Sequence, residues 1–366
     1  MSYLQYVLGT AASVLALAAC LNYFVDPAGI YREGGINPTA YADALIASEH
    51  GLWKPDDAFD ERLVAKAMAK YAQTVECVVI GSSHVMQIGS ARNPKFPSNT
   101  CRSIMNLGVS GASIEDHLTL GFLIFQSEHP NKVLLGIDPW TFAFGKDARW
   151  VAYKGDYLQS RDIIFGEKST NYANDDSVEL TKLKNLINLE YVVRSATAMA
   201  KNVIYGAPKI TSAPKINISV GGELPLRLKD GSHVYSAKYI DEASKLIVPI
   251  GGAVYKTDGE LNQPHAVEAY RKLIRWIKKG GAEPIFILTP YHENVWKVPD
   301  SRTTRALRET ESVAKELARD MGVLLIGSYD PRAVGCLPSE FYDFMHPTAD
   351  CLEKVYRFVI RPHHER

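Results

Sequence analysis

The chain has 366 residues, of which 46% are hydrophobic and 22% charged, and its 41 basic residues equal its 41 acidic ones. This length and composition allow a large core in one domain with an insertion, or in two domains. Because there is no excess or long run of positive charge, the sequence argues against nucleic acid or anionic lipid as the main partner.

An apolar segment without charged residues opens the chain, from Tyr3 to Val25. As a helix it would be about 34 Å long, enough to cross the hydrocarbon core of a bilayer. We therefore predict a transmembrane anchor over residues 1–25 and an exported domain over 26–366. Two alternatives stay open, a cleaved secretory signal and lipoprotein processing at Leu17-Ala18-Ala19-Cys20, and both would also export the rest of the chain.

The cysteines indicate an oxidising compartment rather than a metal site. No two of the five have the CxxC spacing of a zinc site, and four lie outside the apolar segment, enough for one or two disulfides. Cys77 lies inside an apolar run, so we expect it to be a buried thiol. We predict no metal and no cofactor.

Short apolar runs alternate with helical segments along the rest of the chain. A helix is expected over 56–73 and a last one over 348–361. The apolar runs typical of buried strands are 77–80, 103–106, 132–138, 283–290 and 323–327. This alternation predicts an α/β fold with a parallel five-stranded sheet flanked by helices on both faces. Ligands of such sheets bind at the carboxyl ends of the strands.

A long segment with a different sequence pattern lies between the third and fourth predicted strands. We assign the core to about 56–140 and 262–366 and a large insertion to about 141–261. The insertion contains a predicted helix over 178–204 and a hairpin turn at Asp230-Gly231. It is either a lid or substrate platform over the strand ends or a second domain, and the sequence leaves both open.

A serine, a histidine and an aspartate are predicted to meet at the functional edge of the sheet. Ser83 directly follows the first strand, in Gly81-Ser82-Ser83, where its hydroxyl would be exposed. Asp343 precedes His346 by three residues, so it can orient the imidazole while Nε2 faces the serine. Since a serine hydroxyl becomes nucleophilic when such a base takes its proton, we predict a catalytic triad.

Other polar and aromatic residues near this edge have alternative roles. The second Asp-x-x-His, Asp230 to His233, lies at a glycine turn, where we expect a solvated hairpin. His84 directly follows Ser83 in the sequence, and its side chain is expected to point away from the Ser83 hydroxyl. His117 and His292 are expected to be polar surface or substrate-contacting groups. Trp140 is expected either to pack or to stack on a sugar ring.

Four segments, in order, resemble the sequence blocks of the SGNH/GDSL hydrolase superfamily. They are Gly81-Ser82-Ser83, Asn106-Leu107-Gly108-Val109-Ser110-Gly111, Leu135-Gly136-Ile137-Asp138 and Asp343-x-x-His346. The resemblance covers about 76–140 and 283–350 and implies a flavodoxin-like SGNH sheet. It also implies that Ser83 is the nucleophile and that Gly111 gives a backbone N–H to the oxyanion hole.

Two positions depart from the pattern of this superfamily. Ser82 stands where Asp is usual, as in membrane-anchored members such as the D-alanyl-transfer protein of teichoic acid synthesis. Asp138 replaces the oxyanion-hole Asn, and a carboxylate beside a developing oxyanion repels it where an amide would stabilise it. In an active enzyme, we expect Asp138 to be neutralised by an Arg, Lys or hydroxyl, or directed toward the insertion.

The resemblance implies a serine-dependent O-acyltransferase or acylesterase that acts on an extracytoplasmic polysaccharide through an acyl-enzyme. It implies a multi-spanning membrane acyltransferase as partner, an acyl-sugar or polysaccharide as substrate, and a bacterial inner-membrane protein whose main domain is periplasmic or extracellular. The alternative is a non-catalytic membrane-tethered binding or assembly subunit with a degenerate SGNH fold. The acyl group, the polymer and the choice between transfer and hydrolysis stay open.

Overall fold

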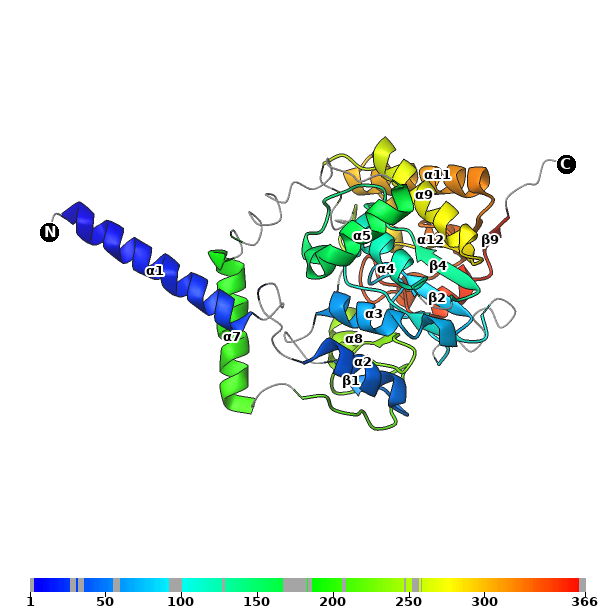
Figure 1. Cartoon of the computed structure of the whole chain (residues 1–366). Helices are drawn as coiled ribbons and strands as arrows, with labels where there is room; N and C mark the ends of the chain where they lie inside the picture. Colours follow the sequence, from blue (N-terminus) through cyan, green and yellow to red (C-terminus); the bar gives the residue numbers. More distant parts are fainter. Residues whose placement is uncertain are drawn as a thin grey trace.

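The chain forms an α/β body, beside which two helices lie together, α1 (Tyr3–Val25) and α7 (Leu189–Tyr205) (Figure 1). The structure is a computed structural model. It describes residues 3–361 apart from 27–30, 32–35, 55–59, 92–100, 127–128, 167–182, 184–185, 206–208, 247, 252–256 and 258. The helix predicted over 178–204 is shorter in the structure, because α7 begins at Leu189, while residues 178–182 and 184–185 lie outside the described ones.

A six-stranded sheet forms the centre of the body. Its strands lie in the order β3 (Ile104–Asn106), β2 (Cys77–Ile80), β4 (Lys132–Gly136), β7 (Glu283–Leu288), β8 (Leu324–Gly327), β9 (Val359–Ile360). The first five are parallel, and β9 pairs antiparallel with β8. The predicted α/β class and all five apolar strands are therefore confirmed.

The prediction of a wholly parallel five-stranded sheet is wrong at its last edge. The helix expected over 348–361 is α13 (Ala349–Val355), and the chain then turns back so that β9 covers the edge of β8. Both residues of β9 are β-branched, which favours an extended conformation, and their pairing satisfies backbone groups that an open edge would expose.

Alternate residues of the strands enter two separate apolar clusters, one on each face of the sheet. The larger cluster is covered by helices, of which the longest are α9 (Pro264–Lys279) and α11 (Arg302–Met321). The same face carries α3 (Glu61–Ala69), α4 (Ile114–Leu123) and α5 (Lys154–Phe165). The smaller cluster is closed by α12 (Pro331–Val334), α13 and the loop between them.

The stretch before residue 55 contains a helix and a short strand, α2 (Pro38–Ala47) and β1 (Leu52–Trp53). The Asn37 side chain accepts a hydrogen bond from Ala40 N–H at 2.9 Å, and Pro38 occupies the first helical turn. Both are helix-start signals, so this helix was predictable from the sequence.

A small second sheet connects this N-terminal stretch to the insertion. β1 pairs with β5 (Leu226–Arg227), which pairs in turn with β6 (His233–Val234). The β5–β6 turn is the predicted hairpin at Asp230-Gly231, and Gly231 has a φ of +81° there. A Cβ atom at this position would lie against the Asn106 carbonyl oxygen. Glycine is therefore required both by the positive φ and by the lack of space for a side chain. The division into core and insertion stays a prediction.

The four cysteines outside α1 form two disulfides. Cys77 is bonded to Cys101, with their Cα atoms 5.7 Å apart, and Cys336 to Cys351, with their Cα atoms 5.1 Å apart. The expectation of a buried thiol at Cys77 is wrong, because β3 begins just after Cys101 and pairs beside β2. Cys20 is exposed on α1 and is not in a disulfide.

Candidate active site

The loop after β2 presents Ser83 at the carboxyl end of the sheet. Two backbone hydrogen bonds tie β2 and its loop to the next glycine-rich segment, Leu107 N–H to Val79 O at 2.8 Å and Val109 N–H to Gly81 O at 3.0 Å. The buried Asn106 side chain donates to the carbonyls of Val85 and Ile88 at 2.7 and 2.8 Å. Asn106 therefore fixes the turn that follows the serine.

Ser83, His346 and Asp343 form a hydrogen-bonded line. Ser83 Oγ lies 2.9 Å from His346 Nε2, and His346 Nδ1 lies 2.7 Å from Asp343 Oδ2. Although Ser83 and His346 are far apart in the sequence, the structure brings the three predicted residues together in the geometry of a serine–histidine–aspartate triad. The Ser83 and His346 side chains are half-buried, so a substrate can reach them.

The Asp343 carboxylate is held by its own loop and by the insertion. Its Oδ1 accepts the backbone N–H groups of Met345 and His346, both at 2.8 Å. Tyr239, in α8 (Ala237–Ser244) of the insertion, donates its phenol O–H to Oδ2 at 3.1 Å. Burial raises the pKa of Asp343, but His346 and the two backbone N–H groups outweigh burial and lower it from 3.8 to about 2. Asp343 therefore stays ionised and can orient the imidazole.

A second carboxylate–imidazole pair lies beside the triad. His84 Nδ1 is 2.5 Å from Asp138 Oδ1, and the two side chains are 1% and 2% exposed. The His84 ring contacts the rings of His346 and Tyr291, with centroids 5.2 Å away in both cases. The Asp138 carboxyl therefore has a buried imidazole as its partner, rather than the Arg, Lys or hydroxyl that was expected.

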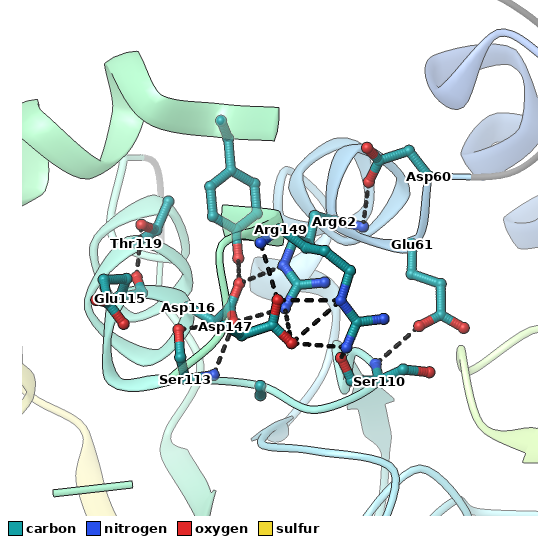
Figure 2. A network of polar contacts seen from close by, with 12 residues as sticks. Asp60, Glu61, Arg62, Ser110, Ser113, Glu115, Asp116, Thr119, Asp147 and Arg149 are labelled. Carbon is teal, nitrogen blue, oxygen red and sulfur yellow. Dashed lines mark hydrogen bonds and ion pairs between the residues drawn. The ribbon is translucent and has the colours of Figure 1, made fainter. Parts of the chain in front are cut away.

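Residues 110–113, which include the predicted oxyanion donor Gly111, are held by hydrogen bonds to side chains on two sides (Figure 2). Glu61 Oε2 accepts Ser110 N–H at 2.7 Å, and Arg149 Nη2 donates to Ser110 O at 2.7 Å. Asp116 Oδ2 accepts Ser113 N–H at 2.7 Å.

Gly111 itself has a φ of +60°, a conformation that glycine adopts without strain. Asp116 is in turn held by α3, because Arg62 donates two hydrogen bonds to its carboxylate, at 2.7 and 2.9 Å. This ion pair is buried, with 3% and 0% of the two side chains exposed. The glycine-rich loop is therefore held at Ser110 and at Ser113 by side chains of other elements and of α4.

Three further side chains near this edge are buried, which confirms the packing alternative for Trp140 and corrects the expectation of a surface position for His117 and His292. Trp140 is 1% exposed and donates to Ala112 O at 2.8 Å, so it packs beneath the glycine-rich loop and cannot stack on a sugar. His117 is buried against Tyr270 instead of exposed, and burial lowers its pKa to about 4. His292 is also buried, and its Nδ1 accepts Asn294 N–H at 3.1 Å to begin α10 (Glu293–Trp296).

The Asp230–His233 hairpin is not solvated, which corrects the expectation for the second Asp-x-x-His. His233 is 6% exposed, and its backbone N–H donates to Met86 O at 2.7 Å. Asp230 Oδ2 accepts Ser90 N–H at 2.7 Å. The hairpin therefore supports the loop that carries Ser83, because two of its residues bond that loop's backbone, and His233 is not the base.

Tyrosines from the insertion and from the histidine loop gather next to His346. The Tyr235 and Tyr239 rings stack with centroids 4.5 Å apart, and Tyr342 meets Tyr235 at 5.0 Å. The Tyr235 centroid is 6.2 Å from that of His346. Tyr235 and Tyr239 are half-buried, so they retain surface for a ligand. No sequence motif indicated this group, because its members come from segments about a hundred residues apart.

No protein-family model matches the sequence, and no curated protein is significantly similar to it. Within the described part of the chain, no group of three or more His, Cys, Asp or Glu side chains is arranged to hold a metal ion.

Proposed function

We propose that the protein is a membrane-anchored serine acyl-ester enzyme of the SGNH type, with Ser83 as nucleophile, His346 as base and Asp343 as its orienting carboxylate. The observation that carries this proposal is the unbroken line of hydrogen bonds, 2.9 Å and 2.7 Å long, from Ser83 to Asp343. The five parallel strands also follow one another in space in the order second, first, third, fourth, fifth, which is the order of flavodoxin-like sheets.

In the proposed reaction, His346 Nε2 takes the Ser83 proton as Oγ attacks the acyl carbonyl of the donor. The tetrahedral oxyanion would be stabilised by the backbone N–H groups of Ser83 and Gly111. The protonated His346 then gives its proton to the leaving oxygen, which leaves an acyl group on Ser83. A sugar hydroxyl or water, deprotonated by His346, attacks this ester and releases the enzyme.

The pairing of Asp138 with His84 supports an active site rather than a degenerate one. An unpaired buried carboxylate next to the oxyanion would oppose catalysis. The buried pair gives Asp138 a partner without occupying Ser83 or His346.

We propose an extracytoplasmic polysaccharide as the acyl acceptor. The support is the tyrosine group beside His346, because half-buried aromatic rings offer an apolar face to a sugar ring and a hydroxyl to its edge. We also propose that α1 anchors the protein in the bacterial inner membrane with the α/β body outside the cytoplasm. Among the described helices, α1 has the length and apolar composition to cross a bilayer. A multi-spanning acyltransferase would supply the acyl group.

A fluorophosphonate probe applied to the full-length protein in detergent tests this proposal. We expect covalent labelling of Ser83 and hydrolysis of a small acetyl ester. Both should be lost in Ser83→Ala and His346→Ala. Ser82→Ala is the matched control, because Ser82 is the buried neighbour and lies outside the triad. Absence of both labelling and turnover in the wild type would instead favour the non-catalytic binding or assembly subunit.

A further inference from the structure

Helix α7 carries an exposed apolar face that the α/β body does not cover. Apolar residues recur at intervals of four and three residues, which places them on one side of a helix. They are Leu189, Val193, Ala196, Ala200 and Val203, and all five are exposed. Leu189, Val193 and Val203 have exposed fractions of 77%, 58% and 80%. Such a face is unusual on a soluble surface and indicates a contact with apolar material.

The opposite side of α7 faces the end of α1. Tyr191, Ser195 and Ala198 form its buried stripe. Tyr191 donates its O–H to Asp26 Oδ1 at 2.7 Å, directly after α1. Asn22 of α1 donates to Leu186 O at 2.9 Å, just before α7 begins. In Figure 1, α7 crosses the last turns of α1, and both helices stand away from the body.

The contact with α1 sets the depth at which α7 would lie. Residues 5–17 of α1 are exposed, and burial is confined to its C-terminal end, where Asn22 is 0% exposed. The apolar span Gln5–Val25 is about 32 Å long as a helix, close to the thickness of the hydrocarbon core. If α1 crosses the bilayer, its C-terminal turns lie at the membrane surface, and α7 lies there beside them.

We propose that α7 is an interfacial membrane helix that lies on the outer surface of the bilayer that α1 crosses, with its exposed face inserted among the lipids. Continuity with α1 selects lipid as the occupant, because the apolar face begins where the spanning helix ends. Amphipathic helices of this kind bury one face at the boundary between headgroups and acyl chains. The inference rests on the proposed anchoring of α1 and is independent of the proposed catalysis.

Site-directed labelling of the full-length protein in phosphatidylethanolamine–phosphatidylglycerol vesicles tests this. Cys20 is replaced by Ser, and one new cysteine carries a fluorophore at Val193 or Val203, or at Arg194 as the matched control. Arg194 is exposed and directly follows Val193 in the sequence, but its side chain points to another side of the helix, outside the apolar face. We expect nitroxide-labelled lipid to quench the fluorophores at Val193 and Val203 at least threefold more than the one at Arg194. Aqueous iodide should show the reverse order.

A fluorophore at Val14 of α1 reports the anchor separately, and catalytic turnover is measured on the same vesicles. Quenching at Val14 without quenching at Val193 would overturn the α7 proposal and leave the anchor intact. Equal access of iodide to Val193 and Arg194 would also overturn the α7 proposal and leave the anchor intact. The apolar face would then be assigned to a protein partner that the vesicles lack. Energy transfer between copies labelled at Val193 would assign the face to a second copy and overturn lipid as its occupant. No quenching at Val14 would overturn the anchor and the α7 proposal together.

Discussion

His84 Nδ1 lies 2.5 Å from Asp138 Oδ1, next to the serine that the proposed reaction uses. Both side chains are buried. Removal of His84 leaves the buried Asp138 carboxyl without its partner, whereas an Asn at position 138 keeps an acceptor oxygen for His84. The two members should therefore respond very differently to substitution.

We expect Asp138→Asn to change turnover of a small ester by less than about fivefold. The Asn oxygen can still accept from His84 Nδ1, so the hydrogen bond between the two side chains is kept. His84→Phe keeps a ring of similar size but leaves the carboxylate unpaired near the oxyanion. We expect it to lower turnover at least about a hundredfold, since one oxyanion-hole interaction is worth about 3 kcal/mol.

The double variant His84→Phe with Asp138→Asn separates this electrostatic effect from a packing effect. It removes the carboxylate, so turnover should recover at least about tenfold over His84→Phe alone. Steady-state kinetics on the three purified variants and the wild type measure this coupling. Equal rates for the single His84 variant and the double variant would assign the loss to packing.

The hydrogen bond from Tyr239 to Asp343 predicts a small effect on turnover. Tyr239→Phe removes one donor from Oδ2, while His346 and two backbone N–H groups still hold the carboxylate. A single hydrogen bond contributes about 1 kcal/mol, so we expect kcat to fall about fivefold. The KM for a small acetyl ester should not change, because the phenol is bonded to the carboxylate. A rise in KM alone would indicate that Tyr239 binds substrate instead.

The parts of the fold that the sequence predicts are those that depend on local patterns. Each apolar run from 77–80 to 323–327 proved to be a strand, because burial on both faces of a parallel sheet demands continuous apolar residues. Asp343 and His346 were predictable as a pair because they are three positions apart in one loop. The catalytic roles of these residues and of Ser83 stay predictions.

What the sequence could not indicate depends on contacts between distant segments. Asp138 was expected to meet an Arg, Lys or hydroxyl, yet the sheet brings the loops after β2 and β4 together and so pairs it with His84. Tyr239 reaches Asp343 from the insertion, across 104 residues of sequence. The disulfide at Cys77 also needed the pairing of β2 with β3, since the apolar run around it is equally typical of a buried thiol.

The Cys336–Cys351 disulfide encloses the loop that carries Asp343 and His346, and the two cysteines are 15 positions apart in sequence. We expect Cys336→Ser with Cys351→Ser to lower stability by about 3 kcal/mol and to reduce ester turnover at least about tenfold, because the loop loses its closure. The matched control is Cys77→Ser with Cys101→Ser, in which strand pairing still positions the segment before Ser83. Denaturant unfolding and turnover of both variants compare the two bonds. A larger loss of turnover in the control would contradict this.

Glu115 on α4 predicts a pH dependence of stability that is separate from catalysis. Burial raises the pKa of its carboxyl from 4.5 to about 7, although the Gly145 N–H donates to it at 2.8 Å. Since the folded-state pKa lies above the unfolded one, the group favours folding most below pH 4.5. That contribution is lost as pH rises through 7. These two pKa values correspond to about 3 kcal/mol of unfolding free energy.

Glu115→Gln should remove this penalty, because the amide stays neutral and keeps an oxygen for Gly145. We expect the variant to be no more stable than the wild type at pH 5 and more stable at pH 8, as measured by denaturant unfolding in detergent. The matched control is Glu61→Gln. Burial raises the pKa of Glu61, but Lys54, Arg227 and the other groups around the carboxylate outweigh burial and hold its pKa well below 4.5. Its ionised form therefore stabilises the fold at both pH values, and its substitution should destabilise at both. A Glu115→Gln variant that loses the same stability at pH 5 and pH 8 would show that the native carboxylate is already ionised at pH 5.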